Sequence, residues 1–112
     1  MITQSPSRQI VLNFPIEKIK ANVNQVCRLK EYALKEKNDL FNTYKIAIVI
    51  GFRVGMMNVT LNSVDENKTD CKFEMYNAVG GATSPSSLSD LMDSFLKMLA
   101  GFLEGRLVIK TK

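Results

Sequence analysis

The chain has 112 residues, of which 46% are apolar and 23% are charged. These fractions are typical of one globular domain, and the length suffices for a hydrophobic core without disulfides or metals. We therefore expect a single domain over residues 1–112. The net charge is +4, and the excess of Lys and Arg lies mainly between residues 16 and 45. It does not form the dense basic stripe with aromatic partners that nucleic-acid-binding domains show, so nucleic acid is not an expected partner.

The residue types exclude most catalytic arrangements. The chain has no histidine, which is the commonest general base and metal ligand. Its two cysteines, Cys27 and Cys71, are too far apart in sequence for a CxxC pair and fall on apolar faces, where free thiols are usually buried. We expect no catalytic residue, no metal and no cofactor, and a protein that is not an enzyme. The first residues contain no apolar signal segment and the chain contains no apolar run of about 18 residues, which predicts a cytoplasmic protein without a membrane span.

The first half of the chain reads as strand, helix and strand. Residues 9–14 alternate as a short strand after a loose start at residues 1–8. Pro15 suits the first turn of a helix, which we expect to end near Lys30. Its apolar face has helical spacing and consists of Ile16, Ile19, Val23, Val26 and Cys27. Residues 31–37 allow either a longer helix or a strand, and a strand is favoured because the next segment then has a hairpin partner.

The middle of the chain predicts antiparallel strands. Residues 44–52 form the clearest one, and Gly51 and Gly55 then indicate a turn or a bulge. Residues 57–64 and 69–78 form a hairpin around a polar turn at 65–68. The side chains expected to point inward are Tyr44, Ile46, Ile48, Ile50, Phe52, Met57, Val59, Leu61, Cys71, Phe73 and Met75.

The last third predicts a loop and a long helix. Small residues make 79–87 a loop, and Ser87 is the expected helix cap, with Asp90 favouring the positive end of the helix dipole. Gly105 is a natural stop, and residues 106–112 should be a loose end. The helix carries a wide apolar stripe, formed by Leu88, Leu91, Met92, Phe95, Met98, Leu99, Phe102 and Leu103. Such a stripe must lie on the sheet, which predicts an α+β fold with strand, helix, antiparallel strands and long C-terminal helix, both helices packed on one face of one sheet.

This order of elements resembles the TATA-binding-protein-like and START-like (helix-grip) architectures. The segment from Ile48 to Gly105 in particular resembles small uncharacterised bacterial domains of this kind. The shared pattern is a strand, a glycine-containing turn from Gly51 to Gly55, a hairpin closed at Asp65–Lys68, a small-residue loop and the long helix. Larger START-like domains often hold an apolar ligand between the sheet and the last helix, so the resemblance implies a ligand cleft in that place.

Two groups of residues are candidate sites. Methionines adapt to varied apolar ligands, and the side chains expected at the sheet–helix junction are Met57, Met75, Phe95, Met98 and Phe102. Their alternative role is to fill gaps in the core. A small-residue loop before a helix can also offer N–H groups to an anion, which makes Gly80, Gly81 and Ser84 a second candidate, although a plain connector has the same composition.

The function that follows is a small non-enzymatic binding or accessory domain. An apolar small molecule would occupy a cleft between the sheet and the last helix. The alternative is a protein–protein interaction module that self-associates through its sheet as a homodimer. Replacing Val49, on the outer face of the sheet, by a charged residue should abolish the homodimer, which distinguishes the second hypothesis from the first.

Overall fold

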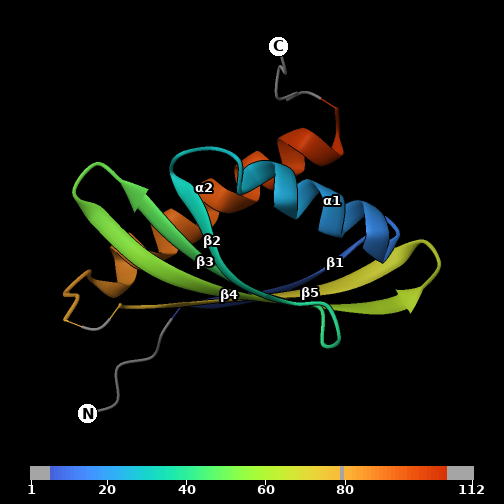
Figure 1. Cartoon of the computed structure of the whole chain (residues 1–112), viewed down its shortest axis with the longest axis horizontal. Coiled ribbons are helices and arrows are strands. Elements are labelled where there is room, and N and C mark those ends of the chain that lie inside the picture. The colour runs from blue at the N-terminus through green and yellow to red at the C-terminus, as the bar shows by residue number, and fades with distance from the viewer. Residues whose placement is uncertain (1–5, 79, 106–112) are drawn as a thin grey trace.

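The structure is a computed structural model that describes residues 6–78 and 80–105. Within these residues the chain forms one five-stranded antiparallel sheet, in the order β1-β5-β4-β3-β2, with two helices on one face (Figure 1). The architecture confirms the expected α+β fold. The strands are β1 (Ser7–Leu12), β2 (Tyr32–Asn38), β3 (Thr43–Ile50), β4 (Arg53–Asp65) and β5 (Lys68–Tyr76), and the helices are α1 (Ile16–Val26) and α2 (Pro85–Leu103).

The core lies between the inner face of the sheet and the two helices. Alternation places every second residue of β3, β4 and β5 on this face, and the apolar stripes of α1 and α2 cover it. The predicted inward residues of the β4–β5 hairpin are confirmed, since all of them are completely buried: Met57, Val59, Leu61, Cys71, Phe73 and Met75. Burying one such side chain contributes about 1.5–3 kcal/mol to folding, so this face holds the sheet and helices together.

Gly55 allows α2 to approach the sheet closely. A Cβ atom at this position would lie 2.7 Å from Leu88 Cδ2, 2.9 Å from Met75 Cε and 3.1 Å from Leu91 Cδ1. These distances are shorter than a packed core tolerates, so the missing side chain makes room for the first turns of the helix. The expectation that Gly55 belongs to a turn or bulge is wrong, because it pairs with Ile48 inside the ladder.

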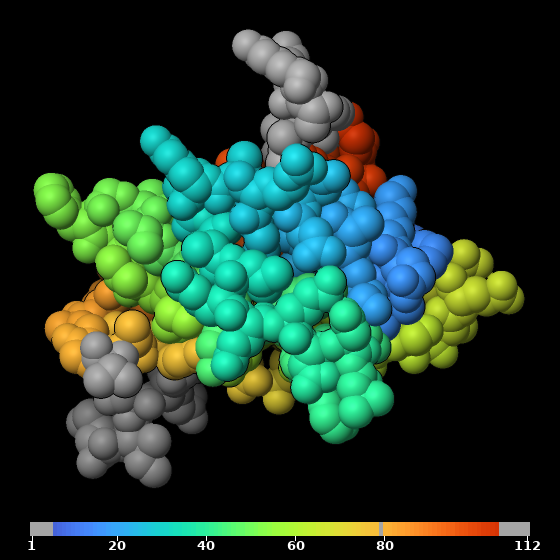
Figure 2. All heavy atoms as spheres, viewed as in Figure 1, coloured from blue at the N-terminus to red at the C-terminus, as the bar shows by residue number. Residues whose placement is uncertain are grey.

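The turn between β3 and β4 is tighter than expected. It consists of Gly51 and Phe52 alone, and Gly51 has a φ of +63°, as the first position of a type II′ turn requires. The predicted strand at 44–52 therefore ends at Ile50. Phe52 was expected to point inward but is fully exposed, because it stands at the tip of the hairpin. The end of the β3–β4 hairpin, green in Figure 2, projects from the body of the molecule.

Residues 32–37 form a strand, as the favoured alternative predicts, and Glu31 lies in the turn before it. They lie in β2, which pairs with β3 from Tyr32 opposite Ile48 onward. The predicted end of the first helix near Lys30 is wrong: α1 ends at Val26, and Cys27 caps it. The sequence carries no stop signal there, and the early end follows from the need to bring Tyr32 into register with the sheet.

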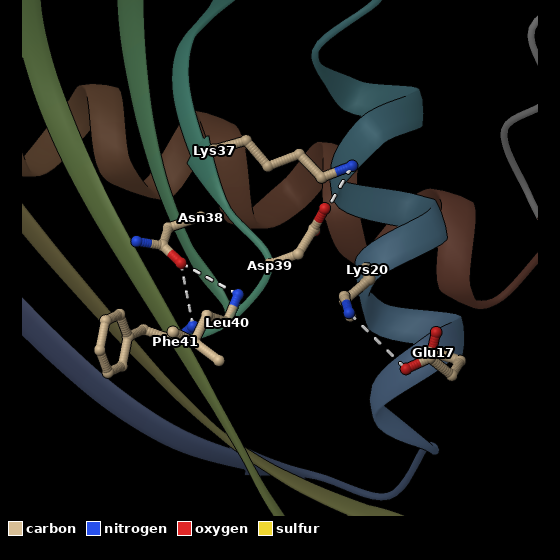
Figure 3. Close-up of polar contacts among 7 residues, drawn as sticks. All are labelled: Glu17, Lys20, Lys37, Asn38, Asp39, Leu40 and Phe41. Carbon is tan, nitrogen blue, oxygen red and sulfur yellow. Dashed lines mark hydrogen bonds and ion pairs between the residues drawn. The ribbon is translucent and has the colours of Figure 1, made fainter.

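The turn between β2 and β3 is built by one asparagine side chain. Asn38 Oδ1 accepts hydrogen bonds from the backbone N–H of Leu40 at 3.0 Å and of Phe41 at 3.1 Å (Figure 3). Lys37 and Asp39 form an ion pair beside it, at 3.7 Å. The side chains of Leu40 and Phe41 remain 82% and 65% exposed at the tip. The polar network therefore fixes the turn without burying its apolar residues.

The remaining boundaries differ slightly from the predictions. β1 starts at Ser7 and ends at Leu12, so Ser7 and Arg8 are paired with β5 rather than loose. α2 starts at Pro85, and its cap is Ser84, whose Oγ accepts a hydrogen bond from the N–H of Ser87 at 3.2 Å. The predicted cap at Ser87 is wrong, because Pro85 occupies the first helical position and moves the start forward.

α2 ends where the sequence predicts, but the predicted effect of Asp90 at its start is wrong, because the first turn holds no acidic residue. Gly105 has a φ of +76° and follows the capping residue, which is the expected stop. Asp90 lies beyond the first turn and forms an ion pair with Arg53 at 3.3 Å instead of acting on the helix dipole. The predicted loose end at 106–112 lies outside the described residues.

Substituting Gly55 by valine should lower the free energy of unfolding by about 1–3 kcal/mol, since the added atoms force α2 away from the sheet. The control is Asn58→Val, which puts the same side chain on the outer face of the same strand and should change stability by less than about 0.5 kcal/mol. Urea denaturation measures both. Equal stability of the two variants would show that the close approach at Gly55 is not a constraint.

Two buried tyrosines should respond differently to replacement by phenylalanine. Tyr32 Oη is 2.6 Å from Ser94 Oγ, so Tyr32→Phe loses a hydrogen bond and should cost about 1 kcal/mol. Tyr44 is only 3% exposed, and its Oη has no hydrogen-bond partner among the described residues. Tyr44→Phe should therefore leave stability unchanged or raise it. Thermal denaturation of the two variants gives the comparison, and a larger loss at Tyr44 would contradict it.

Candidate functional site

An apolar cleft separates the edge strand β1 from the C-terminal half of α2. Its volume is about 300 Å³, and apolar side chains dominate its walls. The residues that line it are Arg8, Ile10, Leu12, Phe14, Leu96, Leu99, Ala100, Leu103 and Glu104. The cleft therefore lies between the sheet and the last helix, where the resemblance to START-like domains implies one.

Two periodicities place these side chains opposite one another. The alternation of β1 directs Arg8, Ile10 and Leu12 towards the helical face of the sheet. Leu96 and Leu103 are seven positions apart, so they lie on one side of α2 together with the residues between them at helical spacing. Leu99 is almost completely buried, whereas Ile10, Leu12, Phe14 and Leu96 are only partly buried against the core. The walls are therefore incompletely packed.

An ion pair holds β1 to α2 at one end of the cleft. Arg8 Nη1 lies 2.6 Å from Asp93 Oδ1, and both side chains are 44% exposed. Asp93 Oδ1 has no aligned hydrogen-bond donor in the described part of the chain, so the pair is a charge contact without good hydrogen-bond geometry. Half-exposed pairs of this kind contribute little to stability. Its effect is to hold the guanidinium near the cleft.

The predicted ligand residues do not line this cleft. Met57, Met75 and Phe95 are completely buried in the core, where Phe95 packs against Tyr32 and Phe73. Met98 and Phe102 are partly buried and also pack against the core. The five residues thus lie at the sheet–helix junction, as expected, but their side chains fill it and do not form the walls of the cleft.

Sequence reasoning found part of the cleft and missed the rest. Leu99 and Leu103 belong to the predicted stripe of the last helix, and β1 was recognised as a strand. Leu96 and Ala100 were missed, because they lie beside the stripe and not on it. The position of β1 next to β5 decides where the cleft opens, and no local pattern reports that order.

Polar groups of the candidate anion loop form hydrogen bonds within the protein. The N–H of Gly81 donates to the carbonyl of Ala78 at 2.7 Å, and Ser84 Oγ caps α2. Thr83 Oγ1 donates to the carbonyl of Val54 at 2.6 Å, which ties the loop to β4. Gly80 is exposed, with a φ of +80°. These contacts suit a fixed connector, and anion binding by this loop stays a prediction.

Neither thiol is activated. Both cysteines are free, and burial raises the pKa of Cys27 to about 11 and that of Cys71 to about 12. A thiol with a raised pKa is protonated at neutral pH and is a poor nucleophile and metal ligand. No group of three or more His, Cys, Asp or Glu side chains that could hold a metal is found among the described residues. In the same residues, no helix is long and apolar enough to cross a membrane.

The outer face of the sheet is not covered by either helix. One row of cross-strand neighbours on it is apolar or aromatic, and it consists of Ala33, Ala47, Met56 and Tyr76. Val49 and Val54 extend this patch and are 47% and 40% exposed. The opposite end of the face is polar, with Lys45, Lys72 and Glu74. This is the surface on which the interaction-module hypothesis depends.

Comparisons with known proteins identify the fold. No family model matches the chain, and no curated protein matches it in sequence. The crystal structure of Ara h 8.0201 matches 91% of this chain and 98% of its own, at 10% identity and a TM-score of 0.60. The solution structure of KanY protein matches 93% and 99%, at 13% identity and a TM-score of 0.50. A START superfamily protein from Mycobacterium smegmatis matches 93% and 97%, at 11% identity and a TM-score of 0.45.

The chain has a helix-grip fold, similar to the folds of Ara h 8.0201 and KanY protein over nearly their whole lengths. This confirms the resemblance that the order of elements suggested. At these identities the likeness concerns the fold alone, because one fold supports many functions. Neither a ligand nor the absence of catalysis follows from it, so the expectation of a non-enzymatic protein stays a prediction.

The buried thiols should make the stability of the protein sensitive to base. The ordinary thiol pKa is 9.0, and the folded values are about 11 for Cys27 and about 12 for Cys71. Between pH 9.0 and the raised pKa of each thiol, that thiol is deprotonated in the unfolded chain but still protonated in the folded chain. The free energy of unfolding therefore falls as pH rises. Urea titrations from pH 8 upward should show the loss begin near pH 9.0.

The control for this prediction is a double variant, Cys27→Ala with Cys71→Ala. Its stability should be lower near neutral pH because buried side chains are truncated, but it should decline less steeply above pH 9.0. A residual decline is expected from Tyr44, whose pKa is raised to about 12 by burial. Parallel profiles for the wild type and the double variant would contradict the assignment to the thiols.

Proposed function

We propose that the protein binds a compact apolar molecule in the cleft between β1 and α2. The observation that supports this is a space of about 300 Å³ with partly buried apolar walls beside a fully packed core. Ligand pockets have volumes of about 300–1,000 Å³, so this one suits a small ligand. The resemblance of the order of elements to START-like domains supports the same location. The guanidinium of Arg8 at the rim would favour a ligand with one polar or anionic end.

The chemistry of the cleft favours binding over turnover. Its ionisable groups are Arg8 and Glu104, and Arg8 is engaged by Asp93. The two thiols lie in other parts of the core and are protonated. Apolar contact supplies the affinity, since each methylene transferred from water into the cleft contributes about 0.8 kcal/mol.

The proposal predicts that filling the cleft removes binding. Ala100→Leu adds a side chain to the cleft wall and should weaken the binding of the fluorescent probe 1-anilinonaphthalene-8-sulfonate by about ten-fold or more. The matched control is Ala21→Leu, which makes the same change on the exposed side of α1 and should leave probe binding unchanged. Fluorescence titration gives both affinities, and thermal melts show that the variants are folded. Equal affinities for the wild type and Ala100→Leu would rule out this cleft as the site.

A further inference from the structure

The two edges of the sheet differ in how they are protected against pairing with another strand. The β2 edge has a register shift between Leu34 and Glu36, and its sequence there is Lys35-Glu36-Lys37. Bulges and charges of this kind prevent edge-to-edge pairing. β1 is regular over its whole length, and its one charged side chain, Arg8, is paired with Asp93. The β1 edge therefore carries none of the protection that the β2 edge has.

The backbone of β1 presents a defined set of groups at this edge. The carbonyl of Pro6 accepts a hydrogen bond from the N–H of Met75 at 2.8 Å, and the two residues are opposite each other in the register. In an antiparallel ladder the bonded pairs alternate, so Arg8, Ile10 and Leu12 continue the set that faces β5. Ser7, Gln9 and Val11 then direct their N–H and C=O groups away from β5. Since β1 is the last strand of the sheet within residues 6–78 and 80–105, these groups point to the edge of the described sheet.

The apolar cleft lies beside the same edge. Ile10 and Leu12 form its floor and α2 forms one wall. β1 ends the described sheet on the other side, and the described residues that line the cleft come from β1, the segment that follows it, or α2 and its end. A strand added to β1 would thus satisfy backbone groups and close the open side of the cleft at once. This combination is the arrangement used in strand addition, where the backbone supplies affinity and pockets accept alternate side chains.

We propose that a second copy of the chain occupies this edge, with its own β1 antiparallel to the first. A two-fold axis at Ile10 pairs Gln9 of one copy with Val11 of the other, so that both sets of edge groups are bonded. It also places the two Ile10 side chains face to face on the helical side of a continuous sheet. The two clefts then meet across the axis and form one enclosed apolar space. Two-fold symmetry is the commonest arrangement of soluble oligomers.

The flank of α2 supports this choice of partner. A shallow surface beside the cleft is lined by Arg8, Asp90, Asp93, Ser94, Leu96, Lys97 and Ala100. Asp93 and Lys97 are one helical turn apart on it, and Leu96 and Ala100 lie between and beyond them. The two-fold axis sets the α2 helices of the two copies antiparallel, so Lys97 of each copy approaches Asp93 of the other. The flank is thus complementary to itself in charge and has an apolar centre.

The dimer does not depend on the proposed function, because it needs no ligand. The dimer would also enclose a ligand between the two copies, and this part of the inference rests on the proposed function. The following experiment uses the unliganded protein, so its failure would leave ligand binding by the monomer open, and a failed probe titration would leave the dimer standing.

Sedimentation equilibrium between about 5 and 200 micromolar tests the proposal. The mass of the wild-type chain should rise with concentration from 12.6 kDa towards twice that value. Ile10→Lys places a charge on the inner side of the edge strand and should abolish the dimer. Val11→Lys makes the same change on the other face of β1 and should keep it. Lys97→Glu changes an exposed side chain and should weaken the dimer by about ten-fold, which guards against an Ile10 variant that does not fold.

Amide exchange locates the interface. In the dimer the N–H groups of Gln9 and Val11 should exchange more slowly as the protein concentration rises, while those of β2 do not change. A monomer at every concentration would overturn the proposal. So would a dimer that survives Ile10→Lys and Lys97→Glu and is lost on Val49→Lys, because that result assigns the contact to the outer face of the sheet.

Discussion

The apolar stripe of α2 can leave water only by lying on the inner face of the sheet, and the rest of the structure follows from that contact. The first turns of the helix are seated most deeply, because Gly55 offers no side chain and Leu88 and Leu91 reach the backbone of β4. Phe95 then packs between Tyr32 and Phe73, which ties the helix to strands on both sides of β4. α1 completes the layer with Ile19, Val23 and Val26.

The same contact explains why space remains at one edge. α2 packs on β4 and β5, at the centre of the sheet, and crosses towards the β1 side only in its second half. The residues of β1 that face it are partly buried and are joined to the helix by a half-exposed ion pair at Arg8. Dense packing at one end of the helix and a gap at the other are consequences of one rigid element lying across a twisted sheet. The cleft is thus a product of the packing geometry.

The fold could be predicted because its signals are local. Alternation in β3, β4 and β5 and the helical stripe of α2 each appear within one segment, and the inward residues from Met57 to Met75 were identified correctly. The boundary of α1 could not be predicted, since it is set by the register of Tyr32 with β3, a contact distant in sequence. Phe52 was misplaced for a related reason: its alternation matches a strand, but the positive φ of Gly51 ends that strand two residues earlier.

The candidate site was harder to predict than the core, and the reason is physical. Large apolar residues such as Met57, Met75 and Phe95 have the composition of a ligand pocket and of a packed core alike, and only their mutual distances separate the two. The residues that line the cleft lie at the borders of the apolar patterns. Leu96 is beside the apolar stripe of α2, and Ile10 is on the edge strand β1. A sequence pattern reports which face of an element is apolar. Whether that face is covered depends on the order of strands in the sheet. β1 stands at the end of that order because it pairs with β5, whose residues lie about sixty positions further along the chain.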